Sequence, residues 1–241
     1  MIPRATAWSL GVKQLAEIDT IIFDMDGTIV LSRDIAIESV RRGAMEMFEE
    51  LEIAASPPDE ERILESIGKP SPEYFAALFP ELEPSVRERI QTRIYELEAE
   101  ILAQGGGEFA PGAPDALVRL RDKGLKLGLA SNCGVAYFES NVRAFRLAEY
   151  FDAMLCSGMR GYPEKSVILK ELLNTLGAVK AMMVGDRCYD IEAATQCGVF
   201  PVGCVYGYGT KQELEGASLI IANLNELIDI LGEKPCCITN S

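Results

Sequence analysis

The chain has 241 residues, of which 48% are hydrophobic, and its formal net charge is −14 with no histidine. A chain of this size and composition can bury one sizeable core plus a smaller module, which excludes an intrinsically disordered protein. The acidic balance argues against nucleic acid or an anionic membrane as a partner, and the missing histidine excludes a Ser-His-Asp hydrolase.

The N-terminal segment up to about Leu15 has no apolar run long enough for a signal peptide, and we treat it as an extension. No stretch has the apolar length that is needed to span a bilayer. The seven cysteines are odd in number and show no repeated Cys-x-x-Cys spacing, which argues against a zinc site. Such a pattern favours reduced thiols, and we expect a cytoplasmic protein.

The first predicted strand is the apolar run Thr20–Phe23, and the loop after it holds Asp24 and Asp26. Because side chains alternate along a strand, residues i and i+2 point the same way, and the two carboxylates can converge on one bound atom. Close carboxylates either raise the pKa of one group or recruit a cation. Gly27 permits a tight turn and Thr28 adds a hydroxyl. This loop favours metal-assisted attack by an aspartate on phosphorus, although Asp-Gly pairs are also typical of ordinary surface turns.

The next segment, residues 32–107, predicts a small helical bundle that is interrupted by prolines and ends in the glycine run 105–107, the clearest hinge signal in the chain. The alternation of Arg and Glu on its helices indicates solvated faces. Because the insert follows the Asp24 loop directly, we expect it to cover the site as a cap that excludes water; the alternative is a purely structural packing role. The predicted helices are Ile35–Leu51, Glu60–Ile67, Tyr74–Leu78 and Val86–Leu102.

Lys69 is the only lysine of this insert, and it lies between Gly68 and Pro70 in a predicted loop between two helices. Such a loop can reach the site when the cap is closed, which makes Lys69 a candidate for substrate specificity. The alternative is a solvated surface lysine, because most lysines are exposed.

Beyond Pro111, short apolar runs alternate with helical patterns. This alternation predicts an α/β fold with a Rossmann-like, mostly parallel sheet covered by helices on both faces. We therefore expect a core domain formed by residues 1–31 and 108–241, with the cap domain 32–107 inserted into it. The predicted strands are 126–130, 153–156, 181–184, 201–205 and 219–221, and the predicted helices are 115–123, 135–145, 167–176, 191–197 and 224–231.

Polar residues follow three elements of this predicted core. Ser131 and Asn132 follow one strand, Lys165 follows a Gly-Tyr-Pro loop, and Asp186 and Asp190 follow another strand. In open parallel sheets, ligands bind beyond the carboxyl ends of the strands. We therefore expect these side chains to meet the Asp24 loop at one site.

With four such motifs in this order, the chain resembles the haloacid dehalogenase superfamily of phosphotransferases. The resemblance implies that Asp24 is the nucleophile and Asp26 the general acid and base. It also implies a phosphate-binding set of Thr28, Ser131, Asn132 and Lys165, and a Mg²⁺ site whose ligands are Asp24, Asp26, Asp186 and Asp190. In capped members of the superfamily, the loop that corresponds to Lys69 often carries residues that discriminate between substrates.

The resemblance therefore implies a Mg²⁺-dependent phosphatase that hydrolyses small phosphomonoesters through an aspartyl-phosphate. The segment Gly198–Gly209 is similar to phosphoglycolate phosphatases, whereas Cys133 and Gly134 depart from their usual pattern, and so does Ser166, which follows Lys165 where a proline is frequent. We expect phosphoglycolate or a small sugar phosphate as substrate. Two alternatives remain: a sugar phosphomutase with the same motifs, and a non-catalytic binding protein on the same fold. A dehalogenase is disfavoured, because it needs neither a second acidic residue nor a metal.

Overall fold

The computed structural model describes residues 15, 17–162 and 164–232. The predicted N-terminal extension falls almost entirely outside these residues. Within the described part, no helix combines the length and the apolar character that crossing a membrane requires.

A parallel six-stranded sheet forms the centre of the protein, with the strand order β5-β4-β1-β6-β7-β8. The central strand β1 pairs with β4 on one side and with β6 on the other, so that Phe23 lies opposite Leu129 and Val184. The chain order reverses at β1, and such a switch point is where open sheets bind ligands. The strands are β1 (Thr20–Phe23), β4 (Lys126–Ser131), β5 (Ala153–Cys156), β6 (Ala181–Gly185), β7 (Phe200–Cys204) and β8 (Leu219–Ile221).

Helices cover both faces of the sheet, as the sequence predicts. Alternation along β1 directs Ile21 and Phe23 to one face and Ile22 to the other, and two separate apolar cores result. The first core packs against α6 (Ala113–Asp122), α7 (Val135–Ala144) and α10 (Asn225–Ile230). The second core packs against α8 (Lys165–Leu176) and α9 (Cys188–Cys197). Short 3-10 turns lie at Leu147–Glu149 and Ser157–Met159.

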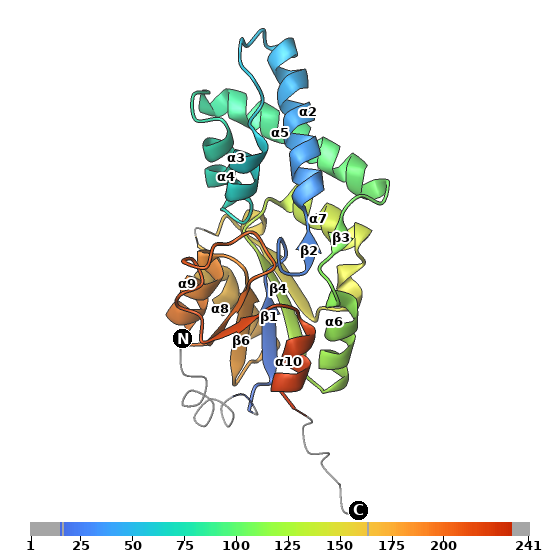
Figure 1. The fold of residues 1–241 in the computed structure, drawn as a ribbon, viewed down its shortest axis with the longest axis vertical. Helices are drawn as coiled ribbons and strands as arrows, with labels where there is room; N and C mark the ends of the chain where they lie inside the picture. The colour runs from blue at the N-terminus through green and yellow to red at the C-terminus, as the bar shows by residue number, and fades with distance from the viewer. Residues whose placement is uncertain (1–14, 16, 163, 233–241) are drawn as a thin grey trace, which may run out of the picture.

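The predicted cap consists of four helices that lie above the carboxyl ends of the strands (Figure 1). These helices have an apolar core of their own, centred on Val40, Ile63, Phe75 and Ile90. An independent core allows the cap to keep its structure while its position over the sheet changes. The helices are α2 (Arg33–Glu50), α3 (Glu60–Ser66), α4 (Ser71–Leu78) and α5 (Pro84–Ala103).

Two short antiparallel strands, β2 (Val30–Leu31) and β3 (Glu108–Phe109), join the cap to the core. They hold both connecting segments side by side, next to the predicted glycine hinge. The sequence analysis did not predict this pair, because two residues are too short to show an alternating pattern.

The predicted helices all form, but two prolines do not separate them as expected. Pro72 lies in the first turn of α4 and Pro84 begins α5, whereas the sequence analysis takes the prolines of this insert as interruptions between its helices. A proline in the first turn has no amide hydrogen to leave unpaired, and its fixed φ suits the helix. The helices α4 and α5 therefore begin two or three residues earlier than predicted.

Candidate active site

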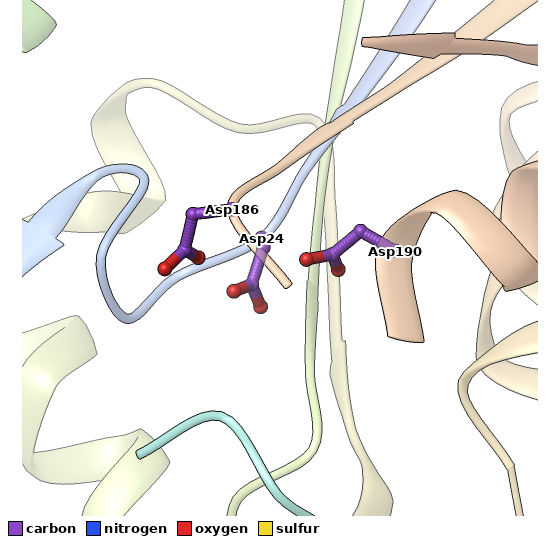
Figure 2. A group of neighbouring side chains, drawn as sticks. All are labelled: Asp24, Asp186 and Asp190. Carbon is purple, nitrogen blue, oxygen red and sulfur yellow. The ribbon is translucent and has the colours of Figure 1, made fainter. Parts of the chain in front are cut away.

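Three buried carboxylates meet at the carboxyl end of the sheet. Asp24 directly follows β1, Asp186 follows β6, and Asp190 belongs to the first turn of α9. Each offers one oxygen, and these oxygens all lie within 4.8 Å of one another (Figure 2). The structure therefore brings together three of the four predicted metal ligands.

Lys165 is the cation that balances this cluster. It is the first residue of α8, and its side chain is 4% exposed. Its Nζ atom lies 2.5 Å from Asp24 Oδ1 and 2.6 Å from Asp190 Oδ1. Burial lowers the pKa of Lys165, but Asp190 and Asp24 outweigh this effect and raise the pKa overall. Lys165 therefore remains an ammonium ion in contact with the predicted nucleophile.

One lysine does not neutralise three buried carboxylates. Burial raises the pKa of Asp24, and the negative charges of Asp190 and Asp186 raise it further against the opposing effect of Lys165. Burial and the charge of Asp190 raise the pKa of Asp186 to about 7. A further cation would relieve this repulsion, and hard carboxylate oxygens are the ligands that Mg²⁺ prefers. The donor set of this cluster therefore fits Mg²⁺.

Asp186 is held in place by two loops. The Thr28 hydroxyl donates a hydrogen bond to Asp186 Oδ1 at 3.3 Å, and the Tyr208 amide donates one to Oδ2 at 2.6 Å. Gly27 has a φ of 81°, and a Cβ atom there would collide with the Asp186 carboxylate. Thr28 thus orients a predicted metal ligand, while its predicted contact with phosphate stays a prediction.

Asp26 lies near the cluster but outside it, and its side chain has a different partner. The Tyr137 hydroxyl on α7 donates a hydrogen bond to Asp26 Oδ1 at 2.6 Å. Burial raises the pKa of Asp26, although the hydrogen bond from Tyr137 opposes this. The structure thus gives the two loop carboxylates different partners: Asp24 contacts Lys165 and the carboxylate cluster, and Asp26 is bound by Tyr137. A metal contact by Asp26 stays a prediction.

Ser131 and Asn132 lie at the end of β4, where the sequence analysis places them. The Ser131 hydroxyl accepts a hydrogen bond from the Cys133 amide at 3.2 Å. Asn132 contacts the cap as well as the cavity: its side-chain amide donates to the Gly68 carbonyl at 2.9 Å, and its own carbonyl accepts from the Ser71 amide at 3.3 Å. Asn132 therefore joins the end of β4 to the loop that contains Lys69.

A cavity of about 60 Å³ lies between core and cap at this point. The core side contributes Asp24, Asp26, Ser131, Asn132 and Tyr137, and the cap side contributes Lys69, Tyr74, Tyr95 and Glu98, among others. The predicted interhelical loop thus reaches the site. Lys69 is only partly exposed, and no salt bridge to it occurs within the described residues.

Arg187 is a contact between core and cap that the sequence analysis missed. It directly follows Asp186 and is 7% exposed. Its guanidinium donates to Glu213 Oε2 at 2.7 Å and to the carbonyls of Glu65 and Ile67 at the end of α3. Carbonyls at a helix C-terminus lack partners in the helix and attract cations. Arg187 therefore ties α3 to the loop that carries Asp186.

The burial of Glu98 differs from the expectation that the charged residues of the cap helices lie on solvated faces. Other charged residues on these helices form exposed ion pairs as predicted, for example Arg93 with Glu96, but Glu98 is only 5% exposed. A signal was present: Ile90, Ile94 and Leu102 recur every four residues on the buried stripe of α5, and Glu98 occupies the position between them. For Tyr137 we find no comparable signal in the sequence.

Comparison with known proteins agrees with the family that the sequence motifs resemble. Residues 21–204 match the model of the haloacid dehalogenase-like hydrolase family. The probable phosphatase IndB of Dickeya dadantii is 27% identical over 220 residues, which cover 86% of this chain and 91% of IndB. A phosphoglycolate phosphatase of Escherichia coli is 27% identical over 150 residues, which are 60% of this chain and 59% of that protein. The CbbY protein of Rhodobacter sphaeroides, solved as a variant with xylulose 1,5-bisphosphate, superposes with a TM-score of 0.73 at 21% identity, covering 87% of this chain and 96% of CbbY.

Proposed function

This chain belongs to the haloacid dehalogenase-like hydrolase family, and we propose that it is a Mg²⁺-dependent phosphatase that hydrolyses small phosphomonoesters through an aspartyl-phosphate on Asp24. The observation that carries the proposal is the position of Asp24. Its carboxylate lies at the switch point of the sheet, in contact with Lys165 and within 4.8 Å of two further carboxylates. A nucleophile of this kind splits hydrolysis into transfer to the enzyme and release to water.

Asp24, Asp186 and Asp190 would hold the metal. Bound there, Mg²⁺ would neutralise charge as two anions approach each other. Lys165, the Ser131 hydroxyl and the backbone at Asn132 would bind the phosphoryl oxygens, because a lysine is a compact charge and hydroxyls and amides add directed donors. Phosphoryl transfer depends mainly on such positioning and charge stabilisation.

Asp26 would protonate the leaving group and then activate water. Burial raises its pKa, which favours this role, because a carboxyl group donates a proton more readily at working pH when its pKa lies closer to that pH. Tyr137 would act as a positioning residue, because its hydrogen bond fixes the Asp26 carboxyl toward the cavity. The absence of histidine leaves carboxylates such as Asp26 as the groups suited to this proton transfer.

The helices of residues 32–107 would serve as a cap that closes over the bound phosphate and excludes water. The contacts of Arg187 and Asn132 with the α3–α4 region would hold the closed position. Lys69 would bind the non-transferred end of the substrate. The free thiols among the described cysteines support a reducing compartment, and we propose the cytoplasm.

The test of the proposed function is a panel of phosphorylated metabolites that includes phosphoglycolate and small sugar phosphates, assayed with Mg²⁺ and with a chelator. We expect free phosphate to be released only when Mg²⁺ is present. Chromatography of the products separates the alternative, because a phosphomutase would return an isomerised sugar phosphate in place of free phosphate. Isomerisation without phosphate release would overturn the proposal.

The role of Lys69 needs a separate comparison. Truncation in Lys69→Ala removes one cation from the cavity. The transition-state stabilisation of phosphoglycolate, and kcat/KM with it, should therefore fall, by roughly 1 to 3 kcal/mol in free energy. The kcat/KM for a phosphomonoester with an uncharged leaving group, such as propyl phosphate, should barely change. Arg62→Ala, at an exposed position of the neighbouring helix α3, is the matched control. An equal effect of Lys69→Ala on both substrates would reject recognition of the substrate by Lys69 and favour the alternative of a solvated surface lysine.

A further inference from the structure

Glu98 is a buried carboxyl group whose hydrogen bonding is incomplete. It projects from α5 of the cap into the cavity that also contains Asp24 and Asp26, and its Oε2 atom has no partner among the described residues. Leaving a buried polar group unpaired costs about 1–3 kcal/mol. A protein that retains such a group at its active-site cavity has a free acceptor there for a ligand.

The surroundings of Glu98 exclude a purely structural ion pair. No salt bridge to it occurs in the described part of the chain, and its charged or titratable neighbours, Asp26, Tyr74, Tyr95 and Tyr137, are acids. Lys69 lines the same cavity, but it is not within salt-bridge distance of Glu98. The cap therefore presents an acidic group and a basic group separately to one small space.

We propose that Glu98 is a specificity-determining residue that binds hydroxyl groups of the leaving group, so that the preferred substrate is a small hydroxylated phosphomonoester, a polyol or sugar phosphate. This inference rests on the proposed phosphatase function and narrows its substrate class. It disfavours phosphoglycolate, because the carboxylate of that substrate can pair with Lys69 but brings a further acceptor, and no donor, toward the unpaired oxygen of Glu98.

Hydroxyl groups satisfy both cap residues at once. A hydroxyl donates a hydrogen bond to the carboxyl oxygen of Glu98, and a neighbouring hydroxyl accepts one from the Lys69 ammonium. An ammonium group on the substrate would satisfy Glu98 but repel Lys69. The cavity is also small, at about 60 Å³, which favours a small leaving group.

The experiment compares Glu98→Leu with the wild-type enzyme on four substrates: glycerol 1-phosphate, propyl phosphate, phosphoglycolate and 2-aminoethyl phosphate. Propyl phosphate has the shape of glycerol phosphate without its hydroxyls, so the pair isolates the hydrogen bonds. Glu96→Leu, two residues away on the exposed side of α5, is the matched control. Glu98→Gln keeps one acceptor oxygen and should retain part of the activity.

We expect kcat/KM of Glu98→Leu to fall about 10- to 100-fold for glycerol 1-phosphate, to stay unchanged for propyl phosphate and to rise for phosphoglycolate. The melting temperature should not fall, since leucine removes an unpaired polar atom, whereas a structural Glu98 would leave the variant less stable.

Other outcomes overturn the inference. Equal changes on all four substrates, no change on any, or a wild-type preference for 2-aminoethyl phosphate would reject hydroxyl recognition by Glu98 and leave the proposed phosphatase intact. If wild-type enzyme with Mg²⁺ releases phosphate from none of the four substrates and from no member of the metabolite panel, the proposed function is wrong. The inference about Glu98, which rests on that function, is then wrong as well.

Discussion

The core half and the cap half of the active site differ in how their charged groups are paired. In the core, Lys165 contacts Asp24 and Asp190, and Asp186 accepts two hydrogen bonds. In the cap, Lys69 has no ion pair and Glu98 Oε2 has no partner within the described residues. A paired network keeps its geometry before substrate arrives, whereas an unpaired group is completed by the substrate. The difference suggests that the core supplies the reaction and the cap supplies the selection.

Removing the nucleophile should have the largest effect. Asp24→Asn keeps the shape of the side chain but loses the carboxylate, so phosphate release should fall to background on every substrate while the protein remains folded. Circular dichroism and thermal melting establish the fold, and a phosphate assay measures turnover. Substantial turnover by the purified variant on any substrate would show that Asp24 is not the nucleophile.

The second prediction separates Asp26 from its positioning residue. Loss of a general acid commonly costs about 10² to 10⁴ in rate, so Asp26→Asn should bind substrate yet turn over slowly. In single-turnover transfer, the defect should shrink for aryl phosphates, whose alcohols leave without protonation. Tyr137→Phe should show the same dependence on the leaving group with a smaller defect. A uniform defect of Tyr137→Phe on alkyl and aryl phosphates would contradict a role that acts through Asp26.

The variant Arg187→Ala tests whether the contact between core and cap contributes to catalysis. Arg187→Ala removes charged hydrogen bonds to the end of α3, each worth about 1.5–3 kcal/mol, and kcat/KM should fall roughly 10- to 100-fold on all substrates alike. Arg33→Ala removes an exposed ion pair with Glu60 within the cap and should change little. Steady-state kinetics of both variants provide the comparison. Substrate-dependent losses in Arg187→Ala would place it among the selective residues.

The smallest expected effect is the pH dependence of the change in stability caused by Glu98→Leu. Burial, and next the charge of Asp26, raise the pKa of Glu98 well above 4.5. The folded state therefore binds the proton of Glu98 more tightly than the unfolded state, and the stability present below about pH 4.5 is lost as the pH rises toward the folded pKa. The melting temperature gained by Glu98→Leu should accordingly be larger at about pH 8 than at about pH 5. Thermal melts of the variant and wild type across this range check the sign, and a gain that shrinks with pH would contradict it.

The sequence predicts the core half well for a local reason. Asp24 and Asp186 each directly follow a short apolar strand, and Ser131 is the last residue of another. Parallel strands bring their carboxyl ends to one edge of the sheet. Residue type and adjacency to a strand were therefore sufficient to place these side chains. Lys165 and Asp190 follow the same logic from the first turns of α8 and α9.

Two other contacts, one within the core and one between core and cap, follow from no local pattern. Arg187 and Tyr137 meet their partners only because elements distant in sequence pack together, from 111 residues between Tyr137 and Asp26 to 122 between Arg187 and Glu65. Glu98 had a local signal in the four-residue repeat of α5, but a charge on a helix is more commonly solvated. The sequence alone therefore showed the chemistry of the site more fully than its selectivity.

The measurement that tests the central claim most directly is the capture of phosphate on the enzyme. Asp26→Asn is mixed with an aryl phosphate and Mg²⁺, quenched in acid and mapped by mass spectrometry, because this pairing permits transfer while slowing the release to water. The account predicts a phosphoryl group on the peptide that contains Asp24, and none after the additional substitution Asp24→Asn. Phosphate release with no phosphorylated peptide, or a phosphoryl group on another residue, would contradict it.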